Sequence, residues 1–216
     1  MTDDNSTSKG KGTGAAAGQA DSPVLGDLRI GDDGKARCRW VGTDAEYLRY
    51  HDEEWGRPLH GDQPLYEKMS LEGFQAGLSW ITILRRRPSF RQVFHGFDPV
   101  RVAAMDDAEI EAAMLNEGII RNRAKVLATI GNAKRVLELT RDHPGALDEL
   151  MWSFAPKPRR ARLTSMSEIP AATEESTAMS KALRKLGFGF VGPTTMYALM
   201  QSAGMVDDHV AGCWRA

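Results

Sequence analysis

Apolar residues recur at spacings typical of helices along most of the chain. Three such sets are evident: Leu65, Met69, Leu71 and Phe74; Ile110, Ala113 and Met114; and Val126, Ile130, Ala133 and Val136. The strict alternation of apolar and polar residues that marks a strand is nearly absent. The pattern predicts an all-α domain of about eight to ten short helices.

Prolines and glycines indicate where these helices begin and end. Proline is favoured in the first turn of a helix, and glycine is favoured just past the last turn. We therefore expect helices to begin near Pro64, Pro88, Pro99, Pro144 and Pro170, and to end near Gly118, Gly187 and Gly204.

One connection between helices is more specific than the others. The pattern predicts helices over residues 179–186 and 194–203, joined by GFGFVGP at residues 187–193, with Thr194 available as a cap. Gly187, Gly189 and Gly192 would let backbone N–H groups approach a phosphate, and the second helix N-terminus adds partial positive charge. The same glycines also suit an ordinary turn between two helices, so both interpretations stay open here.

A single carboxylate stands within the apolar segment LEGFQAGLSWITI at residues 71–83. Burying an isolated acid among such residues is costly. Glu72 therefore indicates either a helix face that reaches solvent or a pocket that holds a partner for its charge. It is the first candidate for chemistry in this chain.

Charge and composition restrict the kinds of partner. The chain has 216 residues, of which 42% are hydrophobic, and a formal net charge of −1, which suits a soluble globular protein and excludes a uniformly basic nucleic-acid coat. Any DNA contact must be local. Basic clusters that could supply it are Arg85, Arg86 and Arg87; Arg121, Arg123 and Lys125; Lys157, Arg159, Arg160 and Arg162; and Lys181, Arg184 and Lys185, although each is more often a solvated helix face.

The amino-terminal residues have a different composition from the rest. Residues 1–35 are rich in Gly, Ser, Asp and Ala and lack aromatic residues, which predicts a disordered tail before a folded domain over residues 36–216. No apolar signal segment follows the N-terminus, and no stretch approaches the ~18 apolar residues of a membrane span. We therefore expect a cytoplasmic protein without a membrane partner.

Both cysteines lie close to a histidine in the sequence. The chain has two Cys and five His, and the pairs are Cys38 with His51 and His209 with Cys213. On a helix, the i, i+4 spacing of the second pair would put both side chains on one face, and the two pairs together could form a tetrahedral Cys₂His₂ zinc site. Two buried free cysteines beside satisfied histidines would look the same, because this is not a standard zinc-finger spacing.

Residues 37–214 closely resemble the 3-methyladenine DNA glycosylase I family, bacterial base-excision repair enzymes of the helix-hairpin-helix class. The resemblance lies in CRWVGTDAEYLRYHDEEWG, LEGFQAGLSWITIL, FDP, GIIRNRAKVLATIGNA, WSF, SEIP, LRKLGFGFVGPTTMYALMQSAG and DDHVAGC, in this order. It implies an all-α helix-hairpin-helix glycosylase-like fold. It also implies excision of N3-methyladenine from DNA and one structural zinc that joins the N- and C-terminal parts.

The resemblance assigns roles to individual residues. It implies zinc ligands at Cys38, His51, His209 and Cys213, and a base pocket of Glu72, Tyr47, Tyr50 and Trp80 with Trp40 and Trp55 in support. The expected DNA contacts at Gly187, Gly189, Gly192 and Thr194 rest instead on the backbone argument for the hairpin given above. N3-methyladenine is cationic in DNA, so aromatic faces and one carboxylate would favour it over neutral adenine.

The implied reaction is hydrolysis of an already weakened glycosidic bond. The enzyme would flip the nucleotide out of the duplex, and Glu72 would act in recognition and electrostatic stabilisation rather than as a nucleophile. Related lyases carry a lysine just after the hairpin, where this chain has Gly192, Pro193 and Thr194, so we expect no strand cleavage. The role of Asp207, in a V-D-x-H segment, stays open.

Two other classes of protein share parts of this pattern. The chain could be a helix-hairpin-helix DNA-binding module without catalysis, or a zinc-stapled interaction protein whose aromatic residues only pack. The presence of Glu72 with Tyr47, Tyr50 and Trp80 argues against both. We expect a monomer whose partner is double-stranded DNA containing alkylated bases.

Overall fold

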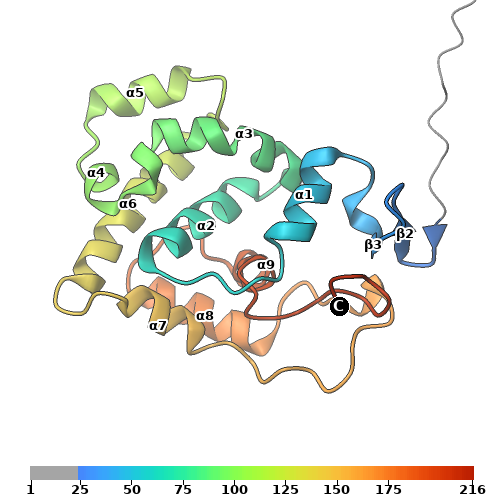
Figure 1. The fold of residues 1–216 in the computed structure, drawn as a ribbon. Helices are drawn as coiled ribbons and strands as arrows, with labels where there is room; N and C mark the ends of the chain where they lie inside the picture. The colour runs from blue at the N-terminus through green and yellow to red at the C-terminus, as the bar shows by residue number, and fades with distance from the viewer. Residues whose placement is uncertain (1–23) are drawn as a thin grey trace, which may run out of the picture.

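The computed structural model describes residues 24–216, and residues 1–23 of the predicted tail lie outside the described residues. Nine α-helices follow one another in the described part (Figure 1): α1 (Ala45–Glu53), α2 (Asp62–Gln75), α3 (Trp80–Val93), α4 (Pro99–Ala103), α5 (Asp107–Leu115), α6 (Arg123–Thr140), α7 (Ala146–Trp152), α8 (Glu174–Lys185) and α9 (Pro193–Ser202). The fold is mostly helical, as predicted. Over residues 24–216, no helix combines the length and the apolar character needed to cross a membrane.

A small sheet precedes the helices and corrects the predicted boundary of the tail. Strands β1 (Val24–Leu25), β2 (Leu28–Ile30) and β3 (Ala36–Cys38) pair antiparallel in that order, with Leu28 opposite Cys38. Residues 24–35 are therefore part of the folded structure, and the domain is not purely α-helical. Composition missed these strands because they are only two or three residues long and depend on distant segments for support.

Those supporting segments come from the other end of the chain. Asp27, between β1 and β2, accepts hydrogen bonds from Ser165 Oγ (2.7 Å) and Met166 N (2.8 Å). The Trp214 N–H donates to Ala36 O at 2.8 Å. The sheet and the carboxyl terminus consequently lie on the same side of the molecule (Figure 1).

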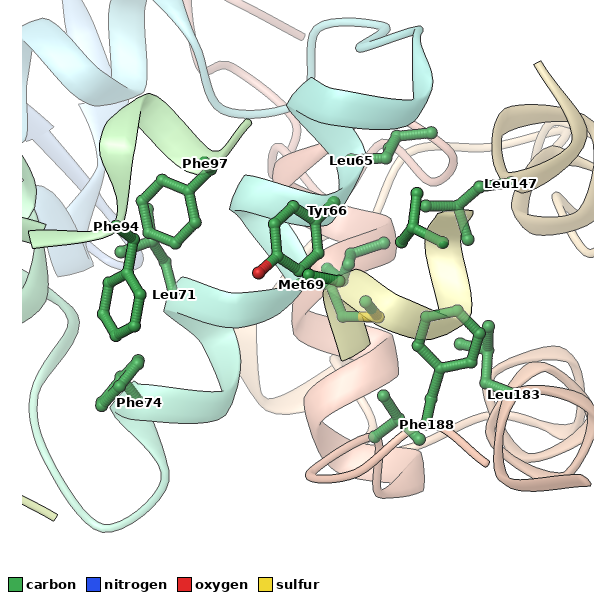
Figure 2. Close-up of a cluster of buried hydrophobic side chains, with 14 of the residues drawn as sticks. Leu65, Tyr66, Met69, Leu71, Phe74, Phe94, Phe97, Leu147, Leu183 and Phe188 are labelled. Atoms are coloured by element: carbon green, nitrogen blue, oxygen red, sulfur yellow. The ribbon is translucent and has the colours of Figure 1, made fainter. Parts of the chain in front are cut away.

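Helix α2 lies at the centre of the helical core. Every residue from 68 to 74 is buried, so this part of the helix has no solvent-facing side. Figure 2 shows Leu71, Phe74, Phe94 and Phe97 on one side of Tyr66 and Met69, while Leu147, Leu183 and Phe188 lie on the other side. Polar residues in this enclosed part of α2 are therefore held in the interior of the protein.

The predicted helical hairpin is present, with shifted boundaries. Helix α8 begins at Glu174 rather than at residue 179, because Thr173 caps it and exchanges hydrogen bonds with Ser176. Helix α9 begins at Pro193, so Gly192 is its N-cap and Thr194 already lies inside the first turn. The predicted Thr194 cap is wrong because proline, which lacks an N–H and has a fixed φ, is favoured as the first helical residue.

The expectation that helices begin near prolines fails at two positions. Pro88 lies inside α3 instead of at a helix start. Pro170 lies in the loop before α8 and stands four positions before Glu174, the first residue of that helix. Pro64 and Pro99 do lie in the first turns of α2 and α4, as expected.

Gly204 lets the segment after α9 pass close to another part of the backbone. Its φ is +71°, and a Cβ there would lie 2.6 Å from Pro58 N and against the Arg57 carbonyl. We expect Gly204→Ala to lower the free energy of unfolding by about 3 kcal/mol, through left-handed backbone strain and a clash with backbone that cannot move aside. Urea unfolding measures this loss.

Gly131→Ala is the matched control. Gly131 lies within α6, and a Cβ there meets nothing within 4 Å. It should raise stability by about 0.5–1 kcal/mol, because alanine has less backbone freedom to lose on folding. Equal effects of the two substitutions would contradict the close approach at Gly204.

Candidate functional site

The predicted pocket residues line one cavity of about 210 Å³ between α1, the end of α2, the start of α3 and α9. Tyr47, Tyr50, Glu72 and Trp80 all face it. The remaining lining residues are Trp40, Trp55, Gln75, Ile169, Ala198, Gln201 and Ser202. Of these, only Trp40 and Trp55 were expected from sequence, because nothing in the local pattern distinguishes the others from ordinary core residues.

Helix α1 sets the position of the two tyrosines. The Asp44 carboxylate accepts hydrogen bonds from Glu46 N and Tyr47 N, which starts the helix just before Tyr47. Tyr50 follows one turn later on the same face. The Tyr47 hydroxyl accepts a hydrogen bond from Ile81 N at 3.1 Å, which joins α1 to the first turn of α3. Tyr47 is therefore held by a backbone contact as well as by packing.

Glu72 lies in a pocket with a partner, which settles the alternative left open by the sequence. Its side chain belongs to the enclosed part of α2 and the residue is 4% exposed. The Ser202 hydroxyl lies 3.0 Å from Glu72 Oε1. Burial raises the pKa of Glu72 to about 7, although nearby Lys68 and the Ser202 hydroxyl act in the opposite direction. The carboxyl group can therefore change charge near neutral pH.

Trp80 adds an aromatic face and an unused donor to the cavity wall. Its ring lies 5.6 Å from the ring of Tyr50 at an interplanar angle of 49°. The Trp80 Nε1–H is buried and has no hydrogen-bond partner among the described residues. A buried donor of this kind is costly unless a bound molecule satisfies it. The cavity thus offers aromatic surfaces and one acid to a flat, polar ligand.

A cluster that could hold a metal ion lies behind this cavity. The ligand atoms of Cys38, His51 and Cys213 are all buried and lie within 4.8 Å of one another. Cys213 Sγ is 3.5 Å from His51 Nε2. The hydrogen bond from the Cys38 thiol lowers the pKa of Cys213 to about 4, so this thiol readily becomes the thiolate that metals require.

His209 is the fourth predicted ligand and lies beside the cluster rather than within it. Its ring centroid is 5.0 Å from that of His51, and its Nε2 is buried without a hydrogen-bond partner in the described part of the chain. The Nδ1 atoms of His209 and His51 each meet a carboxylate at 2.8 Å, from Asp207 and Asp52 respectively. With a carboxylate on Nδ1, the Nε2 atom of each ring is the one that could meet a metal ion.

His209 and Cys213 do not lie on a helix, so their i, i+4 spacing does not act through a helix face. Their segment is irregular and contains one bridge, between Val210 and Leu163. Gly56 makes room for the imidazole, since a Cβ there would lie 2.7 Å from His209 Cε1. The i, i+4 spacing therefore reflects a tight loop that brings both side chains to the same place.

The two aspartates of the DDH segment have separate surroundings. Asp207 contacts His209 and forms an ion pair with Arg162, and its pKa is lowered by these hydrogen bonds despite the opposing effect of burial. Asp208 was not predicted as a site residue, yet it is only 1% exposed. It accepts hydrogen bonds from Tyr197 Oη (2.7 Å) and Gln201 Nε2 (2.8 Å). Asp208 therefore orients Gln201, which lines the aromatic cavity.

Several of the basic residues that were considered as DNA contacts are used inside the protein. Lys125 is buried and its Nζ donates to Phe74 O (2.9 Å) and Ala76 O (3.0 Å) at the end of α2. Arg87 pairs with Glu54, while Arg159 and Arg162 pair with the two aspartates described above. Each of these side chains has a partner within the protein, and Arg159 and Arg162 are also partly exposed.

The glycines of the hairpin also differ in what they can offer a phosphate. The Gly189 N–H donates to Asn132 Oδ1 at 2.7 Å, and the Gly187 N–H donates to Arg184 O at 2.9 Å. These two N–H groups are therefore taken. Gly192 and Thr194 lie at the N-terminus of α9. They remain as predicted contacts, because among the described residues their N–H groups donate to no internal acceptor of this kind.

Comparisons with known proteins agree with this architecture. The chain matches the methyladenine glycosylase family over residues 40–216. It is 48% identical over 178 residues to DNA-3-methyladenine glycosylase 1 of Escherichia coli strain K12, covering 82% of this chain and 95% of that protein. A crystal structure of 3-methyladenine DNA glycosylase I has a TM-score of 0.79 at 45% identity, covering 82% of this chain and 98% of that one.

A more distant relative has the same fold. The 3-methyladenine DNA glycosylase I of Staphylococcus aureus, whose structure addresses 3-methyladenine recognition, is 32% identical with a TM-score of 0.77, covering 82% of this chain and 95% of that one. The chain therefore belongs to the methyladenine glycosylase family, and the resemblance seen in the sequence is confirmed.

The raised pKa of Glu72 makes the stability of the protein depend on pH. The neutral acid is favoured in the fold, so its contribution is fully present below the ordinary pKa of 4.5 and is lost as pH rises through about 7. The glutamine in Glu72→Gln does not ionise, so this variant does not lose stability as pH rises. We therefore expect the difference in free energy of unfolding, variant minus parent, to rise by about 2 kcal/mol from about pH 5 to about pH 8. Urea unfolding at the two pH values measures the change, and a pH-independent difference would contradict burial of an ionisable Glu72.

Proposed function

We propose that this protein hydrolyses the N-glycosidic bond of N3-methyladenine in alkylated double-stranded DNA, as a monomeric base-excision repair glycosylase. The observation that carries the proposal is the placement of Glu72 in an aromatic cavity with Tyr47, Tyr50 and Trp80. Family membership supports it, since the relatives at 48% and 32% identity are named for the same base.

The chemistry of the cavity suits a cationic purine. N3-methyladenine carries a positive charge in DNA, and the faces of Tyr50 and Trp80 attract cations through their π electrons. Ionised Glu72 adds Coulomb attraction in a space that holds little water. Neutral adenine would gain less from the carboxylate and is discriminated against on that basis.

Catalysis would consist mainly of positioning and electrostatic stabilisation. The target nucleotide would leave the duplex and enter the cavity, because its glycosidic bond is out of reach within the base stack. The base departs as a neutral purine and the sugar develops positive charge, so Glu72 would favour the transition state without forming a covalent bond. Gly192, Pro193 and Thr194 provide no amine at the place where related lyases have lysine, so we propose base release without strand cleavage.

The hairpin would bind the DNA backbone at the N-terminus of α9. Thr194 lies in the first helical turn and Gly192 is the N-cap, so their N–H groups carry the partial positive charge of the helix end. Such contacts are independent of base sequence. They would hold the duplex while the base occupies the cavity.

Release of the free base is the experiment that tests this function. We expect the protein to release 3-methyladenine from methylated duplex DNA, and Glu72→Gln to do so about a hundredfold more slowly, since one charge in a desolvated pocket is worth on the order of 2–3 kcal/mol. Single-turnover assays with enzyme in excess measure the chemical step.

Glu138→Gln is the matched control, because Glu138 is an exposed acid of α6 far from the cavity in sequence. It should leave the rate unchanged. A parent protein that binds duplex DNA but releases no base would support the alternative of a DNA-binding module. Equal rates for Glu72→Gln and the parent would remove Glu72 from the proposed site.

We further propose that Cys38, His51, His209 and Cys213 hold one structural zinc ion. The buried, unpartnered Nε2 of His209 and the carboxylates on both Nδ1 atoms support this assignment. When bound, zinc would cross-link the two ends of the domain rather than react, because four protein ligands leave no open position. Asp207 would then orient His209, which is the positioning role left open by the sequence.

Zinc binding predicts a measurable contribution to stability. Elemental analysis of tag-free protein should find about one zinc per chain, because a closed four-ligand site binds tightly. Cys213→Ala should lower both the zinc content and the melting temperature, since the binding free energy of a structural site is folding free energy. Asp207→Asn should weaken zinc binding more mildly, by about tenfold to a hundredfold. An unaltered melting temperature for Cys213→Ala would count against the site.

A further inference from the structure

A second cavity lies next to the aromatic pocket that Glu72 lines. It has a volume of about 300 Å³ and is lined mainly by charged residues, among them Glu54, Glu67, Lys68 and Arg87. Ser202 lines both cavities. Lys68 and Glu72 are one helical turn apart on α2, so their side chains are neighbours on the same face of the helix.

Lys68 is a buried cation close to the aromatic wall. It is 7% exposed, and its Nζ lies 5.2 Å from the ring centroid of Tyr50 and 5.6 Å from that of Trp80. Among residues 24–216, no carboxylate lies within ion-pair distance of this ammonium group. Burial of a lysine is costly, so the charge needs compensation at longer range.

The other acids near Lys68 already have arginine partners. Glu54, which caps α1, binds Arg87 of α3 at 2.5 Å and Arg49 at 2.9 Å. Glu67, the neighbour of Lys68 on α2, binds Arg91 at 2.8 Å. These acids are therefore neutralised within their own pairs.

Glu72 differs from these acids because its partner is the neutral Ser202. Of the acids that act on Lys68, namely Glu72, Glu54 and Glu67, it is the one without an arginine. Lys68 is accordingly the cation that balances the charge of Glu72, and Glu72 is the acid that compensates for the burial of Lys68.

Ser202 allows Glu72 to exist in either protonation state. Its Oγ is 3.0 Å from Glu72 Oε1 and 3.1 Å from Leu199 O, but a hydroxyl has one hydrogen to donate. With Glu72 ionised, the hydroxyl donates to the carboxylate. With Glu72 neutral, the acid donates to Ser202 Oγ and the hydroxyl turns to Leu199 O. Because the hydrogen bonds with Ser202 can form with either protonation state of Glu72, the charged groups nearby determine which state is favoured.

We propose that Lys68 is a positioning residue that keeps Glu72 ionised in the aromatic pocket, an inference that rests on the proposed function. Its ammonium group acts on the Glu72 carboxylate from the preceding turn of α2, and Lys68 lines the charged cavity but not the aromatic one. Lys68 thus sets the pH above which the pocket attracts a cationic base.

The sign of the effect distinguishes this role from a merely structural one. Without the Lys68 charge, Glu72 takes up its proton more readily, so the pH at which it ionises rises. Lys68 also repels a cationic base, and a variant without it loses that repulsion. Removal of the charge should therefore slow excision at low pH and leave it unchanged or faster at high pH.

The test compares pH profiles of Lys68→Met and the parent protein. Single-turnover release of 3-methyladenine is followed from about pH 5 to about pH 9, and the midpoint of the rising limb should move up by about one pH unit in Lys68→Met. Below the midpoint the variant should be about tenfold slower, and at the highest pH it should come within about threefold of the parent. Lys68→Arg keeps the charge and should restore the parent midpoint.

Lys134→Met is the matched control, since it removes an exposed lysine from α6 and should not shift the profile. An unmoved midpoint in Lys68→Met, or an equal loss of rate at every pH, would overturn the proposal. If Lys68→Met does not fold, Lys68→Gln gives the same comparison.

A second measurement does not depend on activity. The ¹³C NMR signal of the Glu72 carboxyl carbon, assigned by its absence in Glu72→Gln, reports protonation directly in the free protein. We expect its titration midpoint to be higher in Lys68→Met than in the parent. A parent protein that releases no base but shows this shift would refute the proposed function and keep the role of Lys68, whereas active protein without the shift would refute the role of Lys68 alone.

Discussion

Enclosure of helix α2 is the constraint on which the rest of the site depends. Because every residue from 68 to 74 is buried, the polar residues of this stretch cannot reach bulk solvent by turning outward. Glu72 consequently keeps its carboxyl group within the protein, where its pKa is raised to about 7 and where a neutral hydroxyl is its hydrogen-bond partner. A carboxylate held in this way is strongly attracted to a positive charge that arrives without its water.

Joining of the two chain ends is the second organising feature. Cys38 ends the small sheet and Cys213 lies near the carboxyl terminus, yet their sulfur atoms share one cluster with His51. Arg37, next to Cys38, also binds Asp52, whose carboxylate holds the His51 ring. The free energy that closes this long loop comes from many weak contacts in addition to any bound metal.

The cluster and the cavity share a wall of aromatic rings. Trp55 lies 4.6 Å from His209 and 5.1 Å from Trp40 between ring centroids, and both tryptophans line the cavity. Loss of order at the Cys/His cluster would therefore loosen the aromatic side of the pocket, while Glu72 on α2 would remain enclosed. The stability of the chain ends and the shape of the cavity are coupled through these tryptophans. This coupling requires no direct part for the cluster in the reaction.

Local patterns in the sequence were sufficient for some features of this protein. Helical spacing of apolar residues predicted the helices and the α8–α9 hairpin, and one acid in an apolar segment identified Glu72, because these signals arise between residues a few positions apart. The Cys/His pairs also stood out by their spacing. The family resemblance then assigned Tyr47, Tyr50 and Trp80 to the same pocket as Glu72, and the structure places them together.

Other features depended on packing between distant segments. The sheet over residues 24–38 is held by Ser165, Met166 and Trp214, which no local pattern connects to it. Ser202 and Lys68 read as ordinary helix residues until α9 and α2 are brought side by side. What the sequence by itself determined was therefore the set of helices and the reactive residues. Only the tertiary structure decided their charge environment, because burial and long-range Coulomb interactions depend on which segments meet in space.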